Sequence, residues 1–261
     1  LKQTGVPLGG FVAGLLLPQV AAAAGWRWAF AVGAAGTLAA AALSPLVRGA
    51  AVLRSVPQPG PNVAPALAPR PPLPRRDVLA VVTYGFLLAG CQWVMMAYLV
   101  LSLHDGRDWS LAEAGAALAA VTAVSVGGRL LWGWFSDRPG RRRESTLLGL
   151  AAVSAAGLAV LALEPPRPLV YVAAAALGGS LAAWNGVYHA LVVERSGAGA
   201  MGRDSGRMLA FLFAGTVCVP PLLGLLSQAT HSWTVLWSAD AALVVVAALV
   251  LRFGLKPRGR V

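Results

Sequence analysis

An arginine within an apolar segment has the clearest chemical potential in this sequence. Arg129 lies eight residues before Asp137, about 12 Å deeper in a helix that rises 1.5 Å per residue. Ionisable groups at such depth are costly and normally face a cavity or a partner. Thr122, Ser125 and Arg129 fall at positions i, i+3 and i+7, on one helical face. That stripe could line a hydrated path and hold an anionic group; equally, Arg129 could snorkel to headgroups or pair with an acid.

Two other apolar segments carry polar or aromatic side chains near their middle. The densest such cluster is Trp184-Asn185-Gly-Val-Tyr188-His189. His189 could exchange protons near neutral pH, although a lone histidine near the end of a segment is more often structural. In the other segment four residues share one helical face, namely Tyr84, Leu88, Gln92 and Met95. Trp93 is adjacent to this face.

Three further residues could bear chemistry, and their surroundings argue against it. Asp240 is the only acid well inside an apolar segment; it could be a proton site, but a structural role with a partner is favoured. Cys91 and Cys218 lie far apart in sequence without metal-ligand spacing, so two small core residues and no metal site are expected. No Gly-x-x-x-x-Gly-Lys-Ser/Thr loop occurs, so neither a nucleotide nor another cofactor is expected.

The composition predicts an all-α integral membrane protein. The 261 residues are 57% hydrophobic and 12% charged, with a mean hydropathy of +0.69. Soluble domains have roughly 25% charged residues, so lipid is the expected solvent. Eight stretches have about the 17 to 25 apolar residues that a span needs, near 6–23, 29–47, 78–103, 111–135, 146–163, 169–193, 208–230 and 233–251.

The net charge of +11 indicates orientation in the membrane rather than a nucleic-acid partner. If the chain starts on the cytoplasmic side and the spans alternate, the outer loops hold only Arg27, Arg107 and Arg167. With Arg129 inside a span, 21 − 3 − 1 = 17 of the 21 basic residues lie on the cytoplasmic side. The positive-inside bias predicts this split, so both chain ends are expected in the cytoplasm. The membrane is expected to be the plasma membrane. Arg141 to Arg143 could also attract anionic lipid of the bilayer.

A proline-rich segment divides the chain. Residues 48–77 hold eight of the 18 prolines and five arginines, so they cannot bury a core and should form an extended cytoplasmic linker. The expected organisation is two helices in 1–47, the linker in 48–77, six helices in 78–251 and a basic tail in 252–261.

The loop between the fourth and fifth spans carries a specific motif. It reads Gly133-Trp-Phe-Ser-Asp137-Arg138-Pro-Gly140-Arg141-Arg142-Arg143. A glycine followed by Asp-Arg-x-Gly-Arg-Arg between two spans resembles the signature loop of the major facilitator superfamily. The opening Lys2-Gln-Thr-Gly5-Val-Pro7-Leu-Gly9-Gly10 is similar to the start of the family's fifth helix, and the linker to its loop between helices six and seven. The resemblance covers essentially all of the chain and aligns its spans with family helices five to twelve.

This resemblance implies a secondary transporter that moves a small solute by alternating access, driven by an ion gradient with H⁺ as the candidate ion. A fainter similarity to cyanate-permease-like and organic-anion branches suggests an organic anion, carried by a symporter. The third and sixth spans correspond to family helices seven and ten, which contribute cavity-lining residues. The substrate-pathway candidates are therefore Gln92, Trp93, Arg129, Trp184, Asn185, Tyr188 and His189.

Four helices of the family pattern are not in the sequence, and the family draws half of its cavity from them. The chain starts at Leu1 rather than methionine, which is typical of a fragment. The missing helices are expected in the same gene or in a companion chain. The alternative is a non-transporting remnant that acts at most as a membrane scaffold or partner subunit. A membrane enzyme is not expected, because no convergent catalytic set and neither a Gly-x-Ser-x-Gly nor a His-Glu-x-x-His motif occurs.

Small residues in the first span are expected to pack helices closely in lipid, and the family's fifth helix lies between its two halves. These residues are Gly5, Pro7, Gly9, Gly10 and Gly14. The family's symmetry also places the start of this helix near the signature loop. Since a carboxylate suits the positive end of a helix, Asp137 and the loop arginines are expected to latch the outward-facing state. The alternative is a solvated loop whose arginines only fix the topology.

The latch hypothesis predicts the effect of Asp137→Asn. Loss of the carboxylate should shift the protein from outward-accessible towards inward-accessible states, which side-specific cysteine labelling in vesicles measures. Asp108→Asn, in an outer loop, is the control and should leave the balance as it is. An unchanged balance in Asp137→Asn would show that the loop is no latch.

Overall fold

The computed structural model describes residues 9, 16–17, 20, 23–50, 74–138, 140, 142–195 and 201–255, without the side chains of 44–50 and 201–204. These residues form helices and connecting turns and contain no strand, which confirms the all-α class. The chain divides into two compact units, one of residues 5–68 and one of residues 1–4 with 69–261. Most of the expected span at 6–23 lies outside the described residues.

The described part of the smaller unit is dominated by α2 (Trp26–Ala50). Gly25 precedes it with a φ of +93°, a backbone conformation that glycine adopts without steric cost. The Gly25 carbonyl accepts from the Trp28 backbone N–H at 3.1 Å, and the Trp26 and Phe30 rings meet edge to face at 6.0 Å. The helix contains the expected span at 29–47 and continues into the segment expected to be linker.

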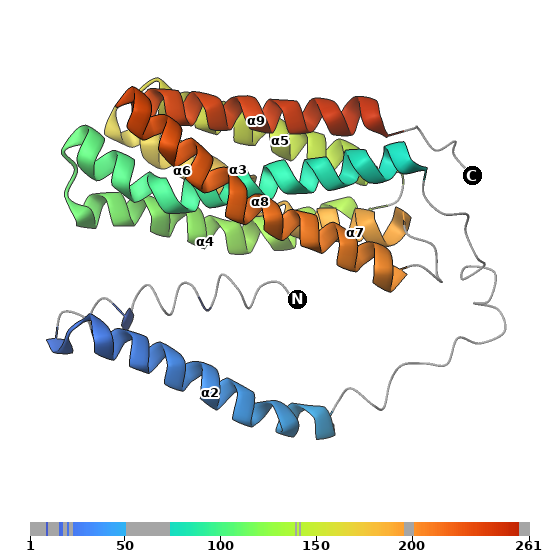
Figure 1. Ribbon diagram of the computed structural model, residues 1–261, viewed down its shortest axis with the longest axis horizontal. Helices are drawn as coiled ribbons and strands as arrows, with labels where there is room; N and C mark the ends of the chain where they lie inside the picture. Colours follow the sequence, from blue (N-terminus) through green and yellow to red (C-terminus); the bar gives the residue numbers. More distant parts are fainter. Residues whose placement is uncertain are drawn as a thin grey trace. The chain divides into compact units, whose positions relative to one another are not determined.

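The larger unit is a bundle of long helices (Figure 1). Four of them are α3 (Arg75–Arg107), α4 (Leu111–Ser136), α5 (Arg143–Ala162) and α9 (Trp233–Gly254). With the Ser205–Thr230 part of α8 (Met201–Thr230), five helices of the described residues are long and apolar enough to cross a membrane. They match five of the expected spans, and α3 begins within the expected linker.

The expected span at 169–193 is wrong as a single helix. The structure has α6 (Arg167–Gly179) and α7 (Asn185–Arg195) instead, separated by non-helical residues 180–184. Hydropathy stays high through this stretch, but Gly178-Gly179-Ser180 favours helix poorly, and neighbouring helices supply hydrogen bonds to the backbone that the interruption frees. An interruption so satisfied is tolerated inside a membrane.

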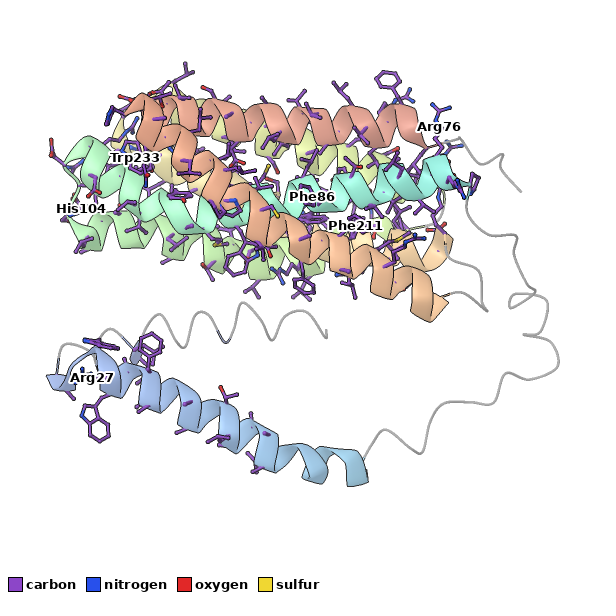
Figure 2. All side chains as sticks on the ribbon, in the orientation of Figure 1. Arg27, Arg76, Phe86, His104, Phe211 and Trp233 are labelled. Atoms are coloured by element: carbon purple, nitrogen blue, oxygen red, sulfur yellow. The ribbon has the colours of Figure 1, made fainter. Side chains whose placement is uncertain are left out.

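The bundle has two distinct ends. Figure 2 shows Arg76 at one end and His104 with Trp233 at the other; we call these the Arg76 end and the His104 end. At the Arg76 end, the Arg76 guanidinium donates to the Phe253 carbonyl oxygen at 2.6 Å and so joins α3 to the end of α9.

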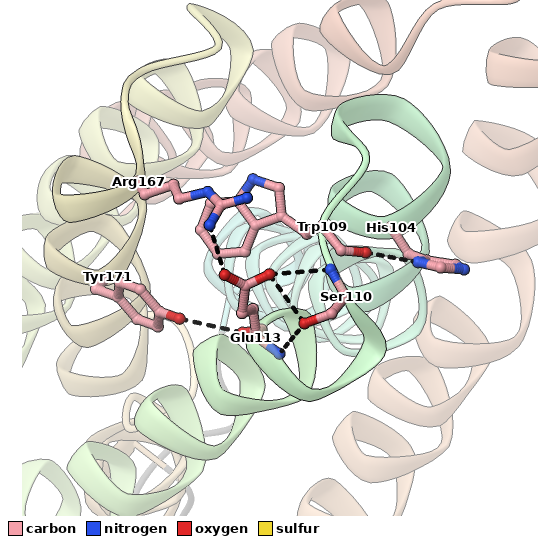
Figure 3. A network of polar contacts seen from close by, with 6 residues as sticks. All are labelled: His104, Trp109, Ser110, Glu113, Arg167 and Tyr171. Carbon is pink, nitrogen blue, oxygen red and sulfur yellow. Dashed lines mark hydrogen bonds and ion pairs between the residues drawn. The ribbon is translucent and has the colours of Figure 1, made fainter.

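A polar network at the His104 end fixes where α4 and α6 begin (Figure 3). Ser110 and Glu113 form a capping box at the start of α4, which satisfies backbone donors that the first turn leaves unpaired. The Glu113 carboxylate also pairs with Arg167 at the start of α6, and the Tyr171 hydroxyl donates to the Glu113 carbonyl oxygen at 3.2 Å. His104 Nδ1 bonds the Trp109 carbonyl oxygen at 2.7 Å.

Between the ends, helices approach closely at glycines. A Cβ on Gly178 of α6 would overlap the Val121 backbone of α4, and one on Gly215 of α8 would overlap the Phe86 carbonyl of α3. Figure 2 labels Phe86 on α3 and Phe211 on α8. Lipid provides no hydrophobic driving force between helices. Small residues at such crossings stabilise the bundle instead, because they let the backbones pack closely.

Gly178→Ala should therefore destabilise the bundle. Overpacking typically costs about 1–3 kcal/mol, because α4 and α6 must separate to admit the methyl group. The matched control is Gly127→Ala in α4, where a Cβ meets nothing within 4 Å. Thermal unfolding in detergent should show a lower midpoint for Gly178→Ala and an unchanged or higher one for Gly127→Ala. Equal midpoints would mean that the close approach does not matter for stability.

Candidate functional site

The interruption between α6 and α7, residues 180–184, is the most unusual backbone feature of the bundle; we call it the break. The ladder of i→i−4 bonds ends there. The Ser180 and Ala182 N–H groups both donate to the Leu177 carbonyl oxygen, at 3.3 and 3.0 Å, and a helical bond resumes from Tyr188 N–H to the Trp184 carbonyl at 3.1 Å. Carbonyls at the break therefore depend on side chains of other helices.

Helix α4 supplies donors to two of these carbonyls. Trp132 Nε1 donates to the Gly179 carbonyl oxygen at 2.6 Å. Arg129 donates to the Ala182 carbonyl oxygen from Nε at 3.1 Å and from Nη2 at 3.0 Å. The expected alternatives for Arg129 were an anionic group, headgroups or an acid; the structure gives it a backbone carbonyl as a partner.

The other side of the break is held by α3. Gln92 Oε1 accepts from Trp184 Nε1 at 3.0 Å and from Asn185 Nδ2 at 3.2 Å. A third helix contributes through Ser154 of α5, whose hydroxyl lies 3.0 Å from that of Ser180. Side chains from α3, α4 and α5 thus converge on one short segment of the chain.

Four of the predicted pathway residues meet at this place. They are Gln92, Arg129, Trp184 and Asn185, brought together from α3, α4 and the break. The arrangement combines a guanidinium with two side-chain amides, groups that can recognise an anionic or hydrogen-bonding solute.

The remaining pathway candidates lie differently. Tyr188 is 1% exposed and its hydroxyl donates to the Val81 carbonyl oxygen at 3.2 Å. His189 is half-buried, with its ring centroid 5.7 Å from that of Tyr188. Trp93 is 54% exposed.

The predicted polar faces are more closely packed than their spacing suggested. Tyr84, Leu88 and Met95 are buried in the core, and the Tyr84 hydroxyl donates to the Leu147 carbonyl oxygen at 3.1 Å. On α4, the hydroxyls of Thr122 and Ser125 donate to carbonyls of their own helix.

The signature loop follows α4 at the Arg76 end. Gly133 lies in the last turns of α4 and Asp137 caps that helix. The Asp137 carboxylate bonds Arg143 at 3.0 Å, and Arg143 also pairs with Glu194 of α7 at 3.2 Å. Glycine suits the φ of +81° at Gly140.

The rest of the expected latch and interface is only partly described. The Arg138 guanidinium stacks on the Trp134 ring at 3.7 Å, and Arg142 precedes α5. Gly9 is helical and exposed. Several expected residues lie outside the described part, namely Arg141 and the helix-interface candidates Gly5, Pro7, Gly10 and Gly14.

A buried ionic cluster at the Arg76 end was not predicted. Arg195 of α7 contacts Asp77 of α3 at 3.3 Å and also pairs with Glu144 of α5; the Arg195 and Asp77 side chains are 5% and 7% exposed. Breaking such a pair by removing one partner typically costs about 3–5 kcal/mol. The partners are 118 and 51 residues away from Arg195, so sequence spacing could not reveal them. The available signal was that Asp77 and Glu144 each directly follow a run of arginines at the start of a predicted span.

Comparison with known proteins agrees with the fold. A family model described as "Major Facilitator Superfamily" matches residues 1–208 and 108–261, which together span the chain. The chain belongs to the major facilitator superfamily. No curated protein matches the sequence.

Among solved structures, the chain is similar to the crystal structure of the E. coli fucose:proton symporter FucP (N162A variant). The TM-score is 0.60 at 16% identity, over 69% of this chain and 43% of that one. The chain thus spans less than half the length of that symporter. At this identity the likeness shows the fold alone. The family and the five long apolar helices of the described residues indicate a multi-pass membrane protein.

Trp132→Phe should loosen the break. The variant keeps a ring but loses the indole N–H that bonds the Gly179 carbonyl; interhelical hydrogen bonds in membrane proteins average about 0.6 kcal/mol. Backbone hydrogen exchange in residues 180–186 should therefore become faster. Trp134→Phe is the control because Trp134 is 58% exposed. Unchanged exchange in Trp132→Phe would show that this bond does not hold the break.

Proposed function

We propose that this chain forms part of a secondary active transporter that moves a small organic anion by alternating access. The observation that carries the proposal is the break, where a helix is interrupted and a guanidinium donates to a buried backbone carbonyl. Transporters of this general kind bind their solutes at interrupted helices near the middle of the membrane.

Arg129 is the residue that favours an anionic solute. Its side chain lies seven residues inside the end of α4, in a helix that is long and apolar enough to cross the membrane. A carboxylate forms shorter and stronger bonds to a guanidinium than a neutral carbonyl does. A bound anion could therefore take over the bonds that Arg129 makes to Ala182, with Gln92 and Asn185 as further partners.

Transport is proposed to be coupled to an ion gradient, with H⁺ as the candidate ion and symport as the mode. The FucP likeness supports this in part, because that protein is named a proton symporter. We further propose that the Arg76 end lies in the cytoplasm, which the positive-inside bias favours, and that the membrane is the plasma membrane. The part of the fold beyond this chain, four further helices in the same gene or a companion chain, would complete the path.

The test is uptake of radiolabelled mono- and dicarboxylates into vesicles that contain the full gene product. Uptake of at least one carboxylate that collapses with the proton gradient would support the proposal. No uptake across the panel would favour the alternative, a non-transporting membrane scaffold or partner subunit.

Arg129→Gln should reduce uptake to background while the protein remains in the membrane, because the neutral side chain cannot pair with an anion. Arg167→Gln is the control, since Arg167 lies at the His104 end and is half-exposed; it should retain uptake. Uptake by Arg129→Gln at the wild-type level would remove Arg129 from the binding site.

A further inference from the structure

Asp240 lies in the middle of the buried face of α9. Residues at helical spacing on this face are buried, among them Leu236, Val244 and Ala247. Asp240 is itself 0% exposed, and neither of its carboxylate oxygens has a hydrogen-bond partner among the described residues. It comes seven residues after the helix start at Trp233, about 10 Å along the axis. The described residues therefore contain no side-chain hydrogen-bond partner of the kind expected for this acid.

No cation among the described residues lies opposite this carboxyl on the helices that pack on α9, which are α3, α5 and α8. On α3 the polar neighbour is Cys91, 0% exposed, whose Sγ donates to the backbone carbonyl of Asp240 at 3.7 Å. The other titratable groups in the middle of α3 are Tyr84 and Tyr98, which donate to the Leu147 and Pro220 carbonyls. Between its ends α5 has no titratable residue, and the middle of α8 has only Cys218, which is exposed.

A negative charge at this position would be strongly unfavourable. Removing an ion from water costs several kcal/mol even after a protein relaxes. Among the described residues no opposite charge offsets that cost, and the polar group nearest to Asp240 is the weak donor of the Cys91 thiol. A buried acid in such surroundings neutralises by binding a proton. A protonated side chain would avoid this cost in the conformation described.

We propose that Asp240 is a proton-binding site that is loaded when α3 and α9 are packed and is emptied when that contact opens to water. The step adds one proton to a carboxylate oxygen and reverses on opening, with no other bond made or broken. This proposal depends on the proposed function in one respect only, namely that a transported solute bound at the break is what moves α3.

The link to the break runs through two consecutive residues of α3. Gln92 bonds Trp184 and Asn185, whereas Cys91 faces α9 and contacts Asp240. A solute that competes for Gln92 would shift or rotate α3, and the same motion would displace Cys91 from Asp240. Proton binding would then depend on what occupies the break.

The adjoining contact of α3 with α8 suits such a motion. Pro220 and Pro221 lie inside α8 and cannot donate backbone hydrogen bonds, which is a common cause of helix bending. At the α3–α8 crossing Gly90 lies against the Val219 side chain and Gly215 lies against the Phe86 backbone, so each glycine lets the facing helix approach closely.

Infrared spectroscopy of the full gene product in lipid vesicles tests the proton directly. The C=O stretch of a protonated carboxylic acid should be present near neutral pH, shift in D₂O, diminish as pH rises and be absent in Asp240→Asn. Asparagine keeps the neutral shape of the protonated acid, so the variant should fold. Asp105→Asn is the matched control, because Asp105 is exposed at the end of α3; it should keep the band.

Alkylation of Cys91 tests the coupling to opening. In a Cys218→Ser background, N-ethylmaleimide should modify Cys91 increasingly as pH rises, and this increase should be smaller in Asp240→Asn. The Asp240→Asn protein corrects for the thiol's own pH dependence.

An absent band, a band that does not change with pH, or equal pH dependence of alkylation in both proteins would overturn the proposal. Neither measurement uses a solute. A failure to detect carboxylate uptake would therefore count against the proposed function alone, and a negative spectroscopic result beside successful uptake would count against Asp240 alone.

Discussion

The bundle depends on how the backbone of one interrupted helix obtains its hydrogen bonds. Within lipid, an unpaired carbonyl or N–H costs several kcal/mol, so an interruption persists only where neighbours supply partners. Here α4 gives Trp132 and Arg129 to the carbonyls of Gly179 and Ala182, and α3 gives Gln92 to the side chains that follow. The positions of α3 and α4 around α6 and α7 follow from this requirement.

The ends of the bundle are held by a different interaction. At the Arg76 end a buried arginine joins α3, α5 and α7 through two acids, and at the His104 end a capping carboxylate joins α4 to α6. Charge pairs fix the ends, whereas glycine contacts and single hydrogen bonds hold the middle. The middle is therefore the part whose contacts can be exchanged at modest cost, which suits a region where a solute binds and leaves.

Sequence patterns predicted those elements whose structure is determined by residues within the element itself. Hydropathy located five helices long enough to cross a membrane, and the loop from Gly133 to Arg143 indicated the family. The break was missed because the mean hydropathy of residues 169–193 stays high. The hydrogen-bond partners that permit the break come from other helices: Trp132 donates to a carbonyl 47 positions away, and Gln92 accepts from a side chain 92 positions away. Helical spacing predicted that Tyr84 shares a face with Leu88 and Met95, but it did not predict that this face is buried in the core.

Helix α3 is where the two polar features of the middle meet. Successive residues of a helix point about 100° apart, so Cys91 and Gln92 can face different neighbours, α9 on one side and the break on the other. A rigid helix cannot turn one of these residues without turning the other. Because close-packed contacts switch between discrete arrangements rather than deforming continuously, a change of partner at Gln92 must be accompanied by a change at the α9 contact. The coupling thus needs no long chain of intermediates: one helix, bonded on two sides by adjacent residues, is sufficient.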